Sequence, residues 1–147
     1  MAFKLNFQEL NCKKDLGLGG YHAIGGATFT FTAGASNIAE VAIQLTRADG
    51  TAIAEPMLFT WWLSDVTTGI GYWTGTSASG TVQAKSAKGV DFHVLVAKKC
   101  TTSQTLATGI YTLEITDTNK GLFYVCVANP LTGKAIVSRV MTAADYG

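Results

Sequence analysis

Short runs of β-branched and aromatic residues, separated by Gly, Asn, Asp and Ser, recur along most of the chain, as is typical of β-strands joined by turns. The sequences RADGT (47–51) and PLTGK (130–134) are typical of tight turns in which Gly adopts positive φ. No segment keeps the apolar period of an α-helix over several turns, so little helix is expected. The predicted strands are 27–33, 39–46, 51–54, 57–64, 80–85, 91–97, 110–117, 121–128 and 134–142. Their lengths and spacing predict an all-β fold, a β-sandwich of about eight strands.

The first 26 residues differ from the rest of the chain. The sequence DLGLGGYHAIGGA (15–27) is rich in Gly and is unlike a core strand. We therefore predict an extended, flexible N-terminal arm over 1–26, with one candidate strand at 3–9 (FKLNFQE), and a single folded domain over 27–147. Such an arm would dock either on its own domain or on a neighbouring molecule.

The predicted strand 121–128 is apolar on both faces. A strand covered on one side only should alternate apolar and polar residues. Alternation along this strand produces two sets of side chains, Leu122, Tyr124, Cys126 and Ala128 on one face and Phe123, Val125 and Val127 on the other. Both faces therefore require a covering layer.

Two adjacent tryptophans lie in the predicted strand 57–64. Because Trp61 and Trp62 are neighbours, their side chains must point to opposite faces of the strand. Trp61 alternates with Phe59 and Leu63 in the more apolar set, so we predict Trp61 in the core and Trp62 outside.

Two further aromatic residues, Tyr72 and Trp73, lie in the Gly-, Thr- and Ser-rich loop 66–80 and are predicted to be exposed. Exposed Trp and Tyr are enriched at protein–protein contacts. Such residues also bind sugars by stacking. We favour protein contact and keep sugar binding as the alternative.

The composition limits the classes of partner. The chain has 147 residues, long enough for one domain with a core, and 48% of them are hydrophobic. Only 14% are charged, against roughly 25% in typical soluble domains. The net charge of +1 and the absence of basic clusters argue against binding to nucleic acid or to an anionic membrane. The sequence contains neither a secretory signal nor an apolar run long enough to span a membrane.

Signals for chemistry are few. The three cysteines, Cys12, Cys100 and Cys126, form no C-x-x-C pair, so we expect free thiols in a protein made in the cytoplasm, with neither a disulfide framework nor a zinc site. Asp91 and His93 are two residues apart and should share one strand face, but no motif places a nucleophile beside them. A structural role is therefore expected for this pair. We predict a protein that is not an enzyme and that needs no metal or cofactor.

Two long segments carry a family resemblance. The segment 42–65 resembles the B–C hairpin of bacterial immunoglobulin-like domains of the invasin type, and 106–129 resembles the E and F strands of such domains. The spacing of Tyr124 and Cys126 is similar to the tyrosine corner and F-strand cysteine of immunoglobulin domains. The resemblance implies an immunoglobulin-like sandwich with Tyr124 and Cys126 in the core.

A more specific resemblance is to structural proteins of tailed bacteriophages. It rests on WLSD-x-x-T-G (62–69), followed by L-x-I-T-D-T-x-x-x-x-F-Y-x-x-V (113–127), and covers about residues 40–142. It implies a viral structural protein located in the virion and assembled in the bacterial host cytoplasm. The expected role is that of a capsid decoration or cement protein bound to the major capsid protein or other virion proteins. A tail or fibre-attachment protein and a carbohydrate-binding adhesive module are the alternatives.

The immunoglobulin-like reading also predicts the binding surface. In that fold strands C, F and G share one sheet, whose outer face would carry Phe123, Val125 and Val127. The candidate assembly interface, between virion proteins or between copies of this chain, consists of Trp62, Tyr72, Trp73, Phe123, Val125 and Val127.

Overall fold

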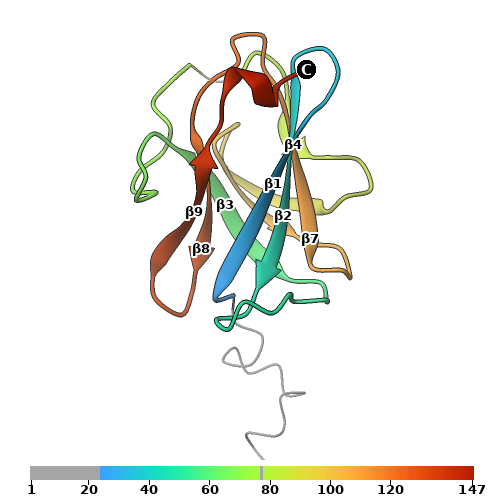
Figure 1. The fold of residues 1–147 in the computed structure, drawn as a ribbon, viewed down its shortest axis with the longest axis vertical. Coiled ribbons are helices and arrows are strands. Elements are labelled where there is room, and N and C mark those ends of the chain that lie inside the picture. Colours follow the sequence, from blue (N-terminus) through green and yellow to red (C-terminus); the bar gives the residue numbers. More distant parts are fainter. Residues whose placement is uncertain (1–23, 77) are drawn as a thin grey trace, which may run out of the picture.

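In a computed structural model of the protein, which describes residues 24–76 and 78–147, nine β-strands form two antiparallel sheets (Figure 1). The first sheet has the order β1 (Gly26–Ala33), β2 (Ile38–Thr46), β7 (Ile110–Thr116) and β4 (Val82–Ala84). The second has the order β5 (Val90–Val96), β6 (Cys100–Gln104), β3 (Leu58–Ser64), β8 (Tyr124–Asn129) and β9 (Lys134–Val140). A single turn of 3₁₀ helix, η2 (Ala143–Asp145), follows β9. The predicted all-β sandwich is confirmed.

The core lies between the sheets and follows from alternation along the central strands. In β2, residues Val41, Ile43 and Leu45 are fully buried, while Glu40, Ala42 and Gln44 between them are partly exposed. Facing them from the second sheet are Phe59, Trp61 and Leu63 of β3, so the prediction that Trp61 belongs to the core is confirmed. Burying a large apolar side chain stabilises a fold by about 1.5–3 kcal/mol, so these central strands dominate the stability.

The division of strands between the sheets matches the immunoglobulin pattern in part. Strands β3, β8 and β9 share one sheet, as strands C, F and G of the immunoglobulin fold do. Strands β1, β2 and β7 share the other sheet, as strands A, B and E do. Because β2 and β3 belong to different sheets, they do not form the expected hairpin. After β3 the chain first adds β4 to the edge of the first sheet and only then extends the second sheet with β6 and β5.

The strand predictions failed at two places. Segment 51–54 forms only an isolated bridge between Thr46 and Ala52. Strand β6, with the sequence CTTSQ, was missed because it has no apolar alternation. Its inward residue Ser103 is buried, and its hydroxyl accepts a hydrogen bond from Trp61 Nε1 at 2.9 Å. A polar strand is stable there because its buried hydroxyl is paired.

A partly buried carboxylate connects the two sheets at their β4–β5 side. Oδ1 of Asp91, in β5, accepts hydrogen bonds from Ser103 Oγ and Tyr111 OH, each at 2.7 Å. Its Oδ2 accepts the backbone N–H of Ala84 in β4, also at 2.7 Å. Burial raises the pKa of Tyr111, and the neighbouring Asp91 raises it further, so the phenol remains a donor. The carboxylate thus links strands of both sheets.

The predicted arm, including its candidate strand 3–9, lies almost entirely outside the described residues. The three residues of 1–26 that the structure describes belong to the sandwich. Ile24 is buried in the core, Gly25 N donates to Thr46 O, and Gly26 begins β1.

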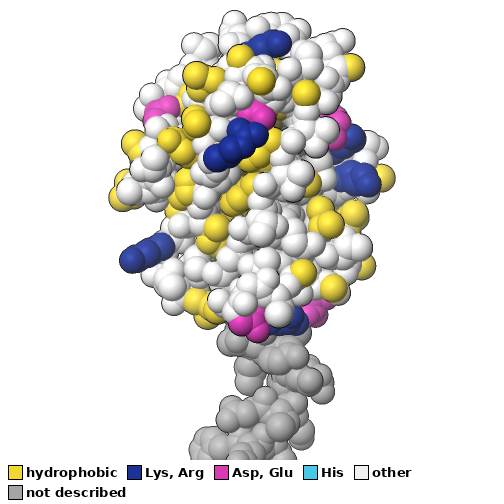
Figure 2. Space-filling model, in the orientation of Figure 1, with side chains coloured by type: hydrophobic (Ala, Val, Ile, Leu, Met, Phe, Trp, Pro, Cys, Tyr) yellow, Lys and Arg dark blue, Asp and Glu magenta, His cyan; other side chains and the backbone are white. Residues whose placement is uncertain are grey.

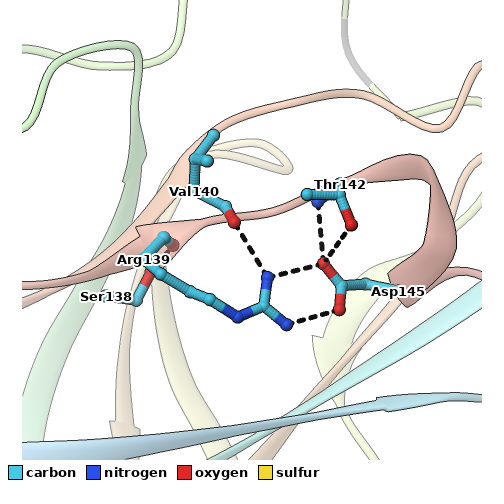
Figure 3. A network of polar contacts seen from close by, with 5 residues as sticks. All are labelled: Ser138, Arg139, Val140, Thr142 and Asp145. Carbon is cyan, nitrogen blue, oxygen red and sulfur yellow. Dashed lines mark hydrogen bonds and ion pairs between the residues drawn. The ribbon is translucent and has the colours of Figure 1, made fainter.

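The C-terminal residues are held against the sandwich by a charged network (Figure 3). Arg139 donates two hydrogen bonds to the carboxylate of Asp145, at 2.8 and 2.5 Å, while Thr142 N donates to the same carboxylate at 2.7 Å. The Arg139 guanidinium also stacks 4.0 Å from the ring centroid of Phe31 in β1. Hydrogen bonds from Arg139 are the main reason that the pKa of Asp145 is lowered to about 2.

We expect Asp145→Asn to lower the free energy of unfolding by about 1–2 kcal/mol at neutral pH, because it removes a charge-assisted pair. Folding lowers the pKa of Asp145 below the ~3.9 of an unfolded Asp, so its stabilisation is complete above that value. It is lost as the pH falls through about 2. Urea unfolding from pH 7 to pH 2 should therefore show the difference between the two proteins shrinking below about pH 4. A difference in unfolding free energy that does not change with pH would contradict the lowered pKa of Asp145 in the folded protein.

Candidate binding surface

Strand β8 presents its two apolar sets the opposite way from the prediction. Phe123, Val125 and Val127 are buried in the core, whereas Cys126 points to the outer face of the sheet and Tyr124 is half-buried. The pairing with β3 explains this, because Val127 lies opposite the inward Trp61 and Cys126 opposite the outward Trp62. Both sets are apolar, so alternation alone could not decide which faced inward. The predicted exposure of Phe123, Val125 and Val127 is therefore wrong, as is the core position of Tyr124.

The outer face over β8 is covered by the loop that follows β3. Trp62 Nε1 donates to Gly69 O at 2.8 Å, which fixes the loop on the sheet. Gly69 has φ +71°, and a Cβ there would lie 2.5 Å from Ala135 Cβ and 3.1 Å from Cys126 Sγ. Only Gly permits this close approach. Cys126 is thus buried, as predicted, but beneath the loop rather than between the sheets, and burial raises the pKa of its thiol to about 12.

Trp73 closes one end of the core instead of lying exposed. Its backbone N–H donates to Leu63 O at 2.7 Å, and its ring lies 4.8 Å from that of Phe123 between centroids. Gly75 and Gly121 pack directly on the indole, where a Cβ would come within 2.4 and 2.9 Å of ring atoms. Gly75 and Gly121 leave the space that the indole fills. Because they are far apart in sequence, a local pattern around Trp73 could not predict its burial.

Only Trp62 and Tyr72 of the predicted interface residues reach the outside. Trp62 is half-buried and Tyr72 is exposed, and together they line a shallow depression with Thr60, Leu95 and Cys100. On the other side of Gly69, Trp62 lines a second depression. That depression is also lined by Thr67, Thr68, Ile70, Ala128, Asn129, Pro130, Gly133, Lys134, Ala135 and Val137.

Strand β5 carries the largest group of exposed apolar side chains in one described strand. The exposed fractions of Val90, Phe92, Val94 and Leu95 are 55, 61, 56 and 50%. The strand lies at the edge of the second sheet, and β-bulges at Phe92 and Leu95 interrupt its pairing with β6. A bulge inserts an extra residue and redirects its side chain. Four of the seven residues in this strand are therefore apolar and exposed.

The exposed apolar side chains continue onto neighbouring elements. Leu58 in β3 and Val90 in β5 lie on either side of Gln104, and Tyr72 lines the same depression as Leu95. We call this group the β5 surface: Leu58, Tyr72, Val90, Phe92, Val94 and Leu95. Val94 lies at its margin, because it is paired with the inward-facing Thr101 and is exposed at the sheet edge. The β5 surface contains no formally charged residue.

Three charged residues close in sequence to the β5 surface are engaged in contacts elsewhere. Asp91 points inward to the network between the sheets. Nζ atoms of Lys98 and Lys99 donate to the backbone oxygens of Ala78 and Gly75. Figure 2 shows the face formed by β1, β2, β7 and β9, where hydrophobic side chains lie between a few separated charged groups. Low charge is thus a property of that face as well.

The bulge at Phe92 also separates the candidate acid–base pair. Asp91 is paired with Ser103, on the inner face, and His93 with Thr102, on the outer face. The expectation that Asp91 and His93 share one face is therefore wrong. Asp91 has the structural role that was predicted, in the network with Tyr111.

Within residues 24–76 and 78–147 no group of three or more His, Cys, Asp or Glu side chains could hold a metal ion. In the same part of the chain, no helix has the length and apolar character needed to cross a membrane. Comparisons with models of protein families, with curated proteins and with solved structures found no significant match to the chain.

We expect Val125→Asp to prevent folding, because a carboxylate would be buried in the core without a partner. The milder change Val125→Ala should lower the free energy of unfolding by about 2 kcal/mol. The matched control Leu131→Asp, at an exposed position of the β8–β9 turn, should change it by less than about 0.5 kcal/mol. Denaturant unfolding measures both values, and a stable Val125→Asp protein would contradict the inward orientation.

We also expect Cys100 and Cys126, which are both free and buried, to resist thiol reagents in the native protein. They lie on either side of Trp62, two strand spacings or about 9–10 Å apart, which exceeds the span of a disulfide. Labelling with an aromatic disulfide reagent at pH 8 should be at least about 100-fold slower than in denaturant, because burial raises both thiol pKa values. Recovery of a Cys100–Cys126 cross-linked peptide would contradict this.

Proposed function

We propose that the protein is a non-enzymatic structural component of a tailed-phage virion, a capsid decoration protein that binds between major capsid protein subunits through the β5 surface. The phage assignment is supported by the sequence resemblance over residues 62–69 and 113–127. The binding role is supported by one observation above all: the β5 surface gathers six large apolar or aromatic side chains and no formal charge.

The chemistry of the β5 surface suits contact with another protein. The cores of protein interfaces are depleted in charge and enriched in aromatic residues. Contiguous apolar patches of a few hundred Å² on soluble monomers are usually functional. Burying each of the six side chains would contribute up to about 1.5–3 kcal/mol before the cost of association is subtracted. The β5 surface therefore takes the place of the predicted interface at Phe123, Val125 and Val127, which are buried in the core.

Two features support a role that does not involve catalysis. The carboxylate of Asp91 is fully engaged with Ser103, Tyr111 and the Ala84 backbone. His93 lies exposed on the other side of the sheet, away from that carboxylate. The polar groups of β5 thus serve the fold or face solvent separately.

The depression lined by Trp62 and Tyr72 supports a second candidate function, binding of a carbohydrate. Stacking on an exposed aromatic ring is the main requirement, and Tyr72 meets it. Trp73, the other residue proposed for sugar contact, is buried and unavailable. Protein contact therefore remains the better supported function, with a tail or fibre-attachment site as the alternative location in the virion.

We expect Leu95→Asp to reduce binding to phage heads at least about tenfold, because its charge would be desolvated at the interface. Leu131→Asp is the matched control, since Leu95 and Leu131 are each 50% exposed. Both proteins should fold with the melting temperature of the unsubstituted chain. Sedimentation with purified heads measures the binding, and equal binding by both variants would exclude the β5 surface.

The same experiment with isolated tails and with a glycan array separates the alternatives. Binding to tails alone would assign the protein to the tail. Glycan retention that is lost in Tyr72→Ala, with no binding to either particle, would favour the carbohydrate-binding function.

A further inference from the structure

We propose that the free edge of β1 binds a second copy of this chain. The two β1 strands would pair antiparallel about a twofold axis at Thr30 and join two four-stranded sheets into one continuous sheet. This contact uses a different edge of the sandwich from the β5 surface, so it does not depend on the function proposed above.

The two sheets have four edge strands, and three of them carry features that hinder the addition of another strand. Strand β4 has only three residues, and β-bulges at Phe92 and Leu95 interrupt β5. Strand β9 has a register shift against β8 and two exposed cations, Lys134 and Arg139. In β1, by contrast, all eight residues pair with β2 in one register, and none is charged or Pro. Of these four edges, β1 is therefore the one suited to pairing with another chain (Figure 1).

The register shows which backbone groups of β1 point away from its sheet. Gly34 N donates to Ile38 O at 2.8 Å and continues the pairing of β1 with β2. Hydrogen-bonded pairs alternate along an antiparallel ladder, so the even-numbered residues of β1 bond to β2 and the odd-numbered ones face the free edge. The outward N–H and C=O groups belong to Ala27, Phe29, Phe31 and Ala33. Within residues 24–76 and 78–147 these groups have no hydrogen-bond partner.

The sequence of this edge is complementary to itself. Residues 26–34 read GATFTFTAG, which is the same in both directions about Thr30. In an antiparallel pair centred on Thr30, each residue lies opposite one of its own type: Ala at 27 and 33, Thr at 28 and 32, and Phe at 29 and 31. The outward groups of both strands then meet and form about eight hydrogen bonds. A contact about a twofold axis must match itself, and this edge does.

The side chains of β1 also suit a second copy. Phe29 and Phe31 pack against the core but remain partly exposed at the open edge. Opposed Phe and Thr pairs stabilise neighbouring antiparallel strands. Arg139, which contacts β1, stacks on the Phe31 ring rather than on the backbone edge, and its charge is paired with Asp145. No uncompensated charge therefore opposes the approach of an identical edge.

The size of the contact sets its strength. A pairing of this length, about 24 Å, removes on the order of 500 Å² from water in total, below the ~1,200 Å² of stable complexes. We therefore expect a weak dimer that forms as the protein concentration rises and dissociates on dilution.

Disulfide trapping of the full-length protein tests both the edge and the register. Cys12→Ser is introduced throughout, so that the added thiols can be followed. Thr30 would lie opposite its own copy in a non-hydrogen-bonded pair, with Cα atoms about 4.5 Å apart, within the span of a disulfide. In glutathione buffer, Thr30→Cys should form a covalent dimer at least about tenfold faster than the matched control Thr28→Cys, whose copies would be about 14 Å apart.

A mixture of two variants provides the complementary result. Thr28 and Thr32 are predicted to lie opposite each other, and both are exposed, as Thr30 is. Mixing Thr28→Cys with Thr32→Cys chains should therefore yield the mixed disulfide at about the rate of Thr30→Cys alone. Equal rates for Thr28→Cys and Thr30→Cys, or no mixed product, would overturn the antiparallel pairing centred on Thr30.

Sedimentation equilibrium of the unsubstituted protein tests the association without any added thiol. The average mass should rise from that of one chain towards that of two between about 10 µM and 1 mM. A monomer throughout this range would overturn the proposal. So would a dimer that Leu95→Asp abolishes, because the contact would then lie at the β5 surface. No phage particle is present in these experiments, so their failure is distinguishable from failure of the head-binding test.

Discussion

Strand β8 is covered on both of its faces around Cys126, and the rest of the structure depends on this arrangement. On the inner face, Trp61 and Val127 are paired within the core. On the outer face, the hydrogen bond from Trp62 to Gly69 holds the loop after β3 over Cys126. A strand covered on both sides needs no polar alternation, which explains the uninterrupted apolar run through Val125, Cys126 and Val127.

The covering loop reaches only part of the second sheet. It covers the outer face around β8 but meets β5, at the sheet edge, only where Tyr72 and Leu95 line one depression. There the bulges at Phe92 and Leu95 leave apolar side chains exposed, and Asp91 is drawn inward by Tyr111 and Ser103. The same strand thus supplies both the hydrogen-bonded carboxylate that links the sheets and the apolar surface proposed for binding.

In the proposed assembly a virion protein would bury the β5 surface and remove its apolar side chains from water. The net gain is smaller than the buried area alone suggests, because association carries its own entropic cost. An uncovered apolar edge also promotes association between free copies of the chain.

Alternation of apolar residues predicted the sandwich, the core position of Trp61 and the outward position of Trp62, because these depend on local periodicity. Local periodicity could not orient β8, since both of its faces are apolar and a shift of one residue exchanges them. Neither could it place β6, whose polar residues are stabilised by partners distant in sequence. The burial of Trp73 beneath Gly75 and Gly121, and the exposure of apolar side chains along β5, were decided by tertiary contacts alone. Which surface is left open depends on where the covering segments end, and that is a property of the assembled fold.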